Sequence, residues 1–124
     1  MKRQDMVDRT REFALRVIRL VSSLPNDRVA AVVGRQLLRS GTSIGANYRE
    51  ASRATTKRHF ASILATALRE ADETLYWLEL IRDAKLIRAE MLGDIIRECE
   101  QLVAILASSV KTASFRDNPG DKAT

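Results

Sequence analysis

The strongest constraint on this chain is an unbroken helical spacing between residues 57 and 85. Seven positions there recur at alternating steps of four and three residues, which is the period of one face of an α-helix. These positions are Phe60, Leu64, Ala67, Ala71, Thr74, Leu78 and Ile81. The spacing predicts one long helix over 57–85, with Thr55 and Thr56 available to cap its first turn.

This helix carries more apolar surface than the core of one bundle requires. Ile63, Tyr76, Trp77 and Leu80 lie to one side or the other of the inward stripe. Large apolar patches on a protein surface mark interaction sites. We therefore expect part of this surface to be buried beyond a single bundle.

Three further segments have the same helical period. One helix is predicted over 6–24, where Pro25 ends it, and a second over 28–53, where Asp27 can cap its start. A last helix is predicted over 88–111, after a short connection at Leu86 and Ile87. The predicted inward positions are Met6, Phe13, Ala14, Val17, Ile18, Leu20, Val21 and Leu24, then Val33, Leu37, Ile44, Tyr48 and Ala51, and finally Leu92, Ile95, Ile96, Cys99, Leu102, Val103, Leu106 and Val110.

The short connections define the fold class. They force sequential helices to run antiparallel, so we expect an all-α, up-down-up-down four-helix bundle over residues 1–112. Residues 113–124 lack a period and are expected to be a disordered tail. No apolar stretch approaches the ~18 residues of a membrane span, and the charged start of the chain has no secretory signal. A cytoplasmic location and a reduced Cys99 thiol are the corresponding expectations.

Three glycines interrupt the second predicted helix. Gly34, Gly41 and Gly45 fall on one side of it, and each costs about 1 kcal/mol of helix propensity relative to alanine. A glycine has no Cβ atom to hold another helix away. We therefore expect a neighbouring helix to pack closely against this side.

Residue types that serve catalysis or metal binding are scarce. The single histidine, His59, and the single cysteine, Cys99, cannot complete a di-iron or zinc site. We expect Cys99 in the core and His59 on the surface or at a helix start. Glu70 and Glu73 are expected in structural ion pairs, with Arg69 as the neighbouring cation. The chain is therefore expected to be no enzyme and to hold no metal or cofactor.

Positive charge is concentrated between residues 28 and 60, where seven basic residues stand against one acidic residue. The first five share the side of the predicted helix opposite its core face, and the last two continue the run. We call this set the basic ridge: Arg28, Arg35, Arg39, Arg49, Arg53, Lys57 and Arg58.

The basic ridge has two interpretations. Its guanidinium groups can bind successive phosphates of a nucleic-acid backbone. Alternatively, they pair with acidic residues on a neighbouring helix or subunit, such as Asp72, Glu79 and Asp83. No aromatic side chains are interleaved with the arginines, so nucleic-acid binding would be directed at the backbone and only weakly selective for sequence.

The ridge overlaps a distinctive motif, Ser-Ile-x-x-Asn-x-x-Glu, formed by Ser43, Ile44, Asn47 and Glu50. With 36–51, Phe60, 67–73 and 75–86, this motif resembles a bacterial family of four-helix-bundle proteins encoded in 23S rRNA intervening sequences, also called the S23 family. The similarity spans residues 8–110. Where the family usually reads Asn-Ile-Ala-Glu-Gly, this chain reads Asn-Tyr-Arg-Glu-Ala.

The resemblance implies antiparallel bundles that assemble as a ring-like homopentamer without catalytic residues. It also implies kinship with accessory proteins of diversity-generating retroelements, which associate with a reverse transcriptase and with nucleic acid. We therefore expect a non-enzymatic oligomer that binds RNA or DNA backbones as an accessory module, without contact to membranes. The alternative is a structural scaffold that presents surfaces to a protein partner and has no nucleic-acid role.

Overall fold

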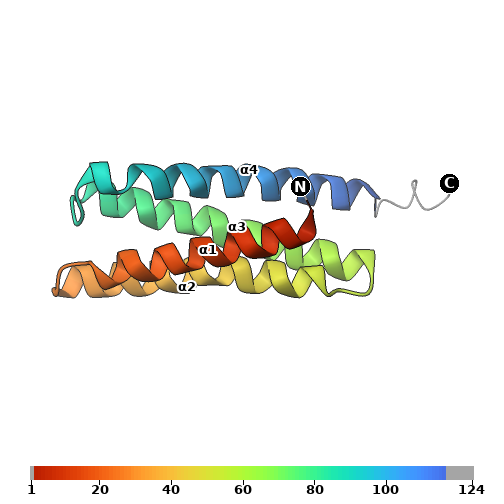
Figure 1. Cartoon of the computed structure of the whole chain (residues 1–124), viewed down its shortest axis with the longest axis horizontal. Coiled ribbons are helices and arrows are strands. Elements are labelled where there is room, and N and C mark those ends of the chain that lie inside the picture. The colour runs from red at the N-terminus through yellow and green to blue at the C-terminus, as the bar shows by residue number, and fades with distance from the viewer. Residues whose placement is uncertain (1, 117–124) are drawn as a thin grey trace.

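The structure is a computed structural model that describes residues 2–116, with side chains described through residue 113. Four helices follow one another: α1 (Arg3–Ser22), α2 (Arg28–Ser52), α3 (Lys57–Asp83) and α4 (Gly93–Arg116), with a short 3-10 turn, η1 (Ala89–Met91), before α4. Each helix runs antiparallel to the one before it, and the described residues contain no strand (Figure 1). The predicted all-α, antiparallel four-helix bundle is confirmed. No helix within the described part of the chain is long and apolar enough to cross a membrane.

Two predicted N-terminal caps are confirmed. Asp27 Oδ1 accepts a hydrogen bond of 2.8 Å from the Ala30 amide at the start of α2. Thr56 Oγ1 accepts one of 3.1 Å from the His59 amide at the start of α3. Each side chain thereby satisfies one of the backbone N–H groups that a helix start leaves without a partner.

The last helix begins later than predicted, at Gly93 rather than at Arg88. Lys85 adopts a left-handed conformation with a φ of 59°, and the Leu86 amide then bonds back to the Ile81 carbonyl at 3.0 Å. This arrangement closes α3, because a left-handed residue turns the chain away from the helix axis. The backbone stays extended at Arg88 and passes through η1 before α4 starts.

The end of α4 also differs from the expectation. The helix continues to Arg116, so residues 113–116 of the predicted tail are helical. The rest of that predicted tail, residues 117–124, lies outside the described residues.

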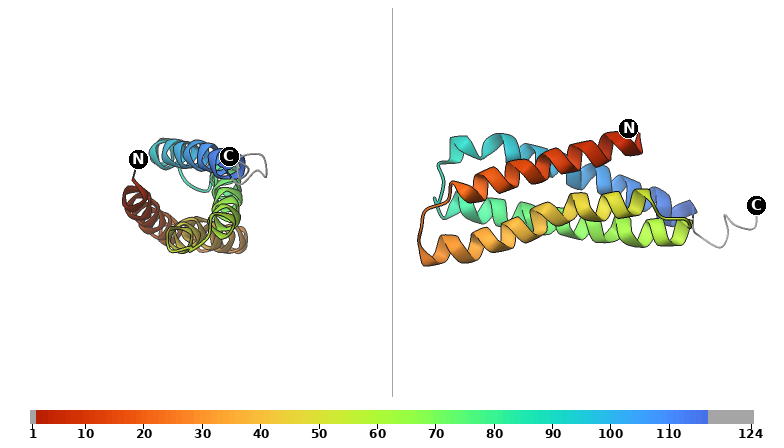
Figure 2. Two further views of the ribbon diagram at one scale, coloured as in Figure 1. Left: turned by 90° about the vertical axis from the view of Figure 1, so that its right-hand side faces the viewer. Right: turned by 60° about the horizontal axis from the view of Figure 1, so that its bottom comes forward.

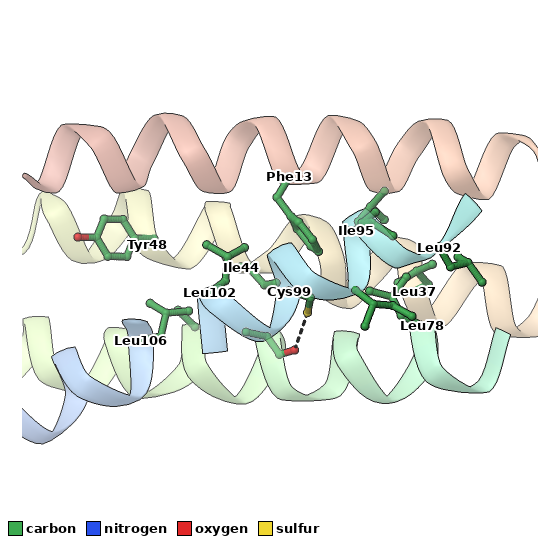
Figure 3. Packing of buried hydrophobic residues seen from close by; sticks show 14 of the residues in the cluster. Phe13, Leu37, Ile44, Tyr48, Leu78, Leu92, Ile95, Cys99, Leu102 and Leu106 are labelled. Carbon is green, nitrogen blue, oxygen red and sulfur yellow. Dashed lines mark hydrogen bonds between the residues drawn. The ribbon is translucent and has the colours of Figure 1, made fainter. Parts of the chain in front are cut away.

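The hydrophobic core follows most of the predicted inward positions (Figure 3). Phe13, Leu37 and Leu102 from three different helices are at most 1% exposed. Two predictions at the stripe edges are wrong. Ile18, predicted to widen the core stripe, is 43% exposed, and Ile63, predicted to lie beside the stripe, is buried. The tilt of each helix against its neighbours decides such edge positions, and the period alone does not contain that tilt.

Close packing of α1 on the glycine side of α2 is confirmed. A Cβ atom on Gly41 would lie 2.8 Å from Val17 Cγ2, and one on Gly45 would lie 3.2 Å from the Thr10 carbonyl oxygen. The missing Cβ atoms therefore let α1 lie almost directly on the α2 backbone.

The helix α1 is held unevenly by its two neighbours. It packs along α2 but touches α4 at few positions, and the end-on view in Figure 2 shows it beside α2 and apart from α4. One polar link joins the first and last helices: the Arg9 guanidinium donates two hydrogen bonds of 2.7 Å to the Glu98 carboxylate. Gln101 accepts a further bond from Arg9, also at 2.7 Å.

A buried hydroxyl pair sets the register between α2 and α3. The Oγ atoms of Ser40 and Thr74 lie 2.9 Å apart, and both residues are fully buried. Each hydroxyl also lies near a carbonyl of its own helix, Leu37 for Ser40 and Glu70 for Thr74. A shift along the helix axis would break the hydrogen bond between the two hydroxyls, and such a bond contributes about 0.5–1.5 kcal/mol to stability.

We predict that Gly41→Ala lowers the free energy of unfolding by about 1–3 kcal/mol, as overpacked core positions do. The added methyl group meets Val17, which is fully buried and has no room to move. The clash outweighs the gain of about 1 kcal/mol in helix propensity. Urea unfolding at a fixed protein concentration measures the difference.

The matched control is Gly93→Ala at the start of α4, where the new Cβ meets only the guanidinium end of Arg97. This variant should be as stable as the original chain or more stable. An unchanged or raised unfolding midpoint for Gly41→Ala would contradict the close approach of α1.

Candidate nucleic-acid interface

All seven residues of the basic ridge are exposed: four on α2, Arg53 directly after its last residue, and two at the start of α3. The straight arrangement predicted for the arginines follows from one uninterrupted helix of 25 residues. At 1.5 Å per residue, this helix extends over ~38 Å. The structure then assigns different surroundings to different members of the ridge.

Arg39 is engaged in an ion pair between α2 and α3. Its guanidinium donates to Glu70 Oε2 at 3.2 Å and to Glu73 Oε2. The Trp77 indole N–H also donates to Glu73 Oε2, at 3.0 Å, and with the Arg39 bond it holds the pKa of that carboxyl below its usual range.

The predicted structural role of Glu70 and Glu73 is therefore confirmed, but the neighbouring cation is Arg39 rather than Arg69. The Arg69 guanidinium instead donates to Thr66 Oγ1 at 3.0 Å, one turn away on the same helix. Arg39 faces α3 because the register between the two helices brings it there. Its position in the sequence pattern does not separate it from the other ridge arginines.

The other six ridge residues make no ion pair within the part of the chain that the structure describes. In particular, none of them reaches Asp72, Glu79 or Asp83 of the same chain. Asp83 pairs with its neighbour Arg82 at 2.9 Å. Within one protomer, pairing of the ridge with acidic residues therefore holds for Arg39 alone among the described ion pairs. Its partners are Glu70 and Glu73 rather than the three carboxylates that were expected.

A groove of about 420 Å³ runs between α1 and α2 beside the ridge. Three arginines line it: Arg49 from α2, Arg53 directly after α2, and Arg11 from α1. Its other lining residues are small, apolar or uncharged, and none is a carboxylate: Gln4, Val7, Ala14, Thr42, Gly45, Ala46 and Ser52. The small side chains leave the space between the helices open, and the arginines give the groove its positive charge.

Arg11 is the functional candidate that sequence reasoning missed. It lies in residues 1–27, where six basic residues are nearly balanced by four acidic ones, so composition does not single it out. The close contact of Gly45 with Thr10 brings Arg11 alongside the last turns of α2. The glycine pattern, combined with the helical period of 6–24, is the signal that could have found it.

Lys57 lines a different cavity, at the end of the bundle where α3 begins. Arg28, Arg35 and Arg58 lie on the surface outside both cavities. The seven predicted residues are therefore divided between an ion pair, a groove, an end cavity and open surface.

The residues considered for catalysis have structural surroundings. Cys99 is fully buried, its thiol lies 3.4 Å from the Ala71 carbonyl oxygen (Figure 3), and burial raises its pKa to about 12. A thiol in this environment is protonated and poorly nucleophilic. His59 is exposed in the first turn of α3, where its backbone amide contacts Thr56. Among the described residues, no three His, Cys, Asp or Glu side chains gather as a metal site requires.

Comparison with known proteins gave matches of two kinds and one negative result. A search of curated protein sequences found no match. The crystal structure of a protein of unknown function from the S23 ribosomal protein family of Bacteroides thetaiotaomicron VPI-5482 is similar, with a TM-score of 0.82 and 40% sequence identity. The similarity covers 90% of this chain and 99% of that chain. The sequence model of the 23S rRNA-intervening sequence proteins matches residues 2–108, and the chain therefore belongs to this family.

Proposed function

We propose that this protein is a non-enzymatic accessory module that binds the backbone of RNA or DNA. The observation that carries the proposal is the α1–α2 groove, which brings Arg11, Arg49 and Arg53 together with no carboxylate among its lining residues. A cluster of unpaired guanidinium groups repels itself in the free protein. A polyanion that releases its counterions on binding removes this repulsion.

The shape of the surface favours contact with phosphates over contact with bases. Arg28 and Arg35 continue the positive surface along the same helix, so successive phosphates of one strand can follow the α2 axis. Each guanidinium can donate two parallel hydrogen bonds to a phosphate group. No aromatic residue lines the groove, so stacking with bases contributes little and sequence selectivity is weak.

The family description associates its members with intervening sequences of 23S rRNA, and we include RNA among the proposed ligands. We also propose a cytoplasmic location, because the chain has a single cysteine and keeps it as a buried free thiol, as a reducing compartment allows.

Assembly with further copies of the chain is part of the proposal. Tyr76 and Leu80 lie one turn apart on α3 and are 55% and 37% exposed. Asp72, Glu79 and Asp83 also lie on α3, where they can pair with basic residues of another copy that lie outside the groove. A contact between two different surfaces of the same chain repeats head to tail, as a closed ring of subunits requires.

The groove proposal predicts a change in salt dependence. Replacing Arg11, Arg49 and Arg53 by Gln should lower the slope of log affinity against log salt concentration by about two to three, since each lost phosphate contact removes about 0.7–0.9. Affinity for a mixed-sequence RNA, measured by fluorescence anisotropy at several salt concentrations, gives the slope.

The matched control replaces Arg82, Arg88 and Arg97 by Gln. These arginines have carboxylate neighbours and lie outside the groove, so the same loss of charge should leave the slope nearly unchanged. Equal effects of the two triple variants would reduce the proposal to non-specific attraction. No RNA or DNA binding by the unmodified protein would favour the scaffold alternative.

The assembly proposal predicts that Tyr76→Ser combined with Leu80→Ser lowers the mass of the particle in solution. The double variant removes apolar contact area from the α3 surface without touching the buried core. Sedimentation equilibrium at micromolar concentration measures the mass. Met91→Ser, at a residue 58% exposed in η1, is the control and should not change it. A double variant with the original mass would place the subunit contact elsewhere.

A further inference from the structure

A second cavity, of about 510 Å³, lies at the end of the bundle where α1 and α3 begin (the right-hand end in Figure 1). Arg3 and Lys57 give it two positive charges, and none of its lining residues is a carboxylate. Hydroxyl groups form much of the remaining wall, and they come from the α2–α3 connection and from α4: Thr55, Thr56, Ser108, Ser109 and Thr112. The hydroxyls of Ser109 and Thr112 already donate to carbonyls of α4. The cavity is therefore polar and positively charged.

Tyr48 contributes a buried hydroxyl to this cavity. The residue is 6% exposed and lines the cavity wall, and Figure 3 shows its hydroxyl directed away from Ile44, towards the end of α2. Within the described part of the chain, this hydroxyl has no hydrogen-bond partner. Burial raises the pKa of the phenol, so the group is protonated and available as a donor.

Arg3 is held beside Tyr48 by an aromatic contact. Its guanidinium carbon lies 4.3 Å from the centre of the Phe60 ring, and Arg3, Tyr48 and Phe60 line the same cavity. Neither Arg3 nor Lys57 makes an ion pair with a carboxylate of the described residues. Both charges remain available to a ligand.

The start of α3 adds backbone donors. Thr56 accepts the amides of His59 and Phe60, whereas the amides of Lys57 and Arg58 come first in the helix and have no partner within it. The carbonyl end of α2 is close by, but its last turn is closed by the amides of Arg53 and Ala54 at 3.1 and 3.0 Å. The local backbone field is therefore suited to an anion.

We propose that this cavity binds the phosphate monoester group of a nucleotide, either free or at the 5′ end of a nucleic-acid strand. A phosphate monoester has three terminal oxygens and carries up to two negative charges, which match the Tyr48 hydroxyl, the two cations and the α3 amides. The volume of about 510 Å³ exceeds that of an inorganic anion and leaves room for the ester group beside Ala54 and Ala113. The site is separate from the α1–α2 groove, so it stands or fails independently of the proposed function.

The test compares four probes by isothermal titration calorimetry: inorganic phosphate, AMP, and one RNA oligonucleotide with either a 5′-phosphate or a 5′-hydroxyl. We expect the 5′-phosphorylated RNA to bind more tightly than its 5′-hydroxyl counterpart. AMP binding identifies free nucleotides as a ligand. A 5′-phosphate preference without AMP binding assigns the cavity to strand ends. The proposal is overturned if AMP does not bind and the 5′-phosphorylated RNA binds no more tightly than its 5′-hydroxyl counterpart.

Tyr48→Phe is the decisive variant, because it removes only the hydroxyl. Affinity for the phosphate monoester should fall about tenfold, as for one lost hydrogen bond to a charged group. The unliganded variant should melt at the same temperature as the original chain or higher, since the hydroxyl has no described partner to lose. Lys57→Gln should weaken binding in the same way. Original affinity in both variants would place the phosphate elsewhere and overturn the proposal.

Arg53→Gln separates the two sites. Arg53 lines the groove but not the end cavity. This variant should weaken binding of the RNA chain while the ratio of affinities for the 5′-phosphorylated and 5′-hydroxyl RNAs stays the same. A ratio that falls to one in Arg53→Gln would assign the phosphate preference to the groove.

Discussion

The glycines on one side of α2 are the constraint on which this bundle depends. At Gly41 and Gly45, α1 occupies the space that a Cβ atom would take, next to Val17 and the backbone of Thr10. This approach fixes where α1 lies, and α1 then places Phe13 in the core. The same approach makes the groove that holds Arg11 beside Arg49. Packing and the candidate site therefore have one structural cause.

The features that the sequence predicts well are those encoded within single helices. They include the period of 57–85, the caps at Asp27 and Thr56, and the glycine side of α2. Each of them depends on residues a few positions apart in the sequence. The features that it misses depend on how two helices meet. Arg39 reaches Glu73, and Arg11 joins the groove, because of interhelical register and tilt. The late start of α4 results from the extended backbone at Arg88 and the 3-10 turn η1, which the helical period does not reveal.

The basic residues of the ridge have different electrostatic roles although they share one stretch of sequence. Arg39 pairs with two carboxylates of α3, so its charge is largely neutralised within the protomer. Arg49 and Arg53 keep their charge and face a groove without carboxylates, and Lys57 faces a cavity of the same character. Net charge alone therefore overstates the surface available to an anionic partner and does not locate it.

The uneven attachment of α1 has a consequence for local opening. Its contact with α2 is long and tightly interlocked, whereas its backbone approaches α4 at few positions, where Arg9 is bonded to Glu98 and Gln101. Native-state opening begins where few apolar contacts must break, so the boundary between α1 and α4 is the first to loosen. In such a fluctuation α1 and α2 move together as a hairpin. The cationic groove between them would then stay intact while the contact between α1 and α4 is open.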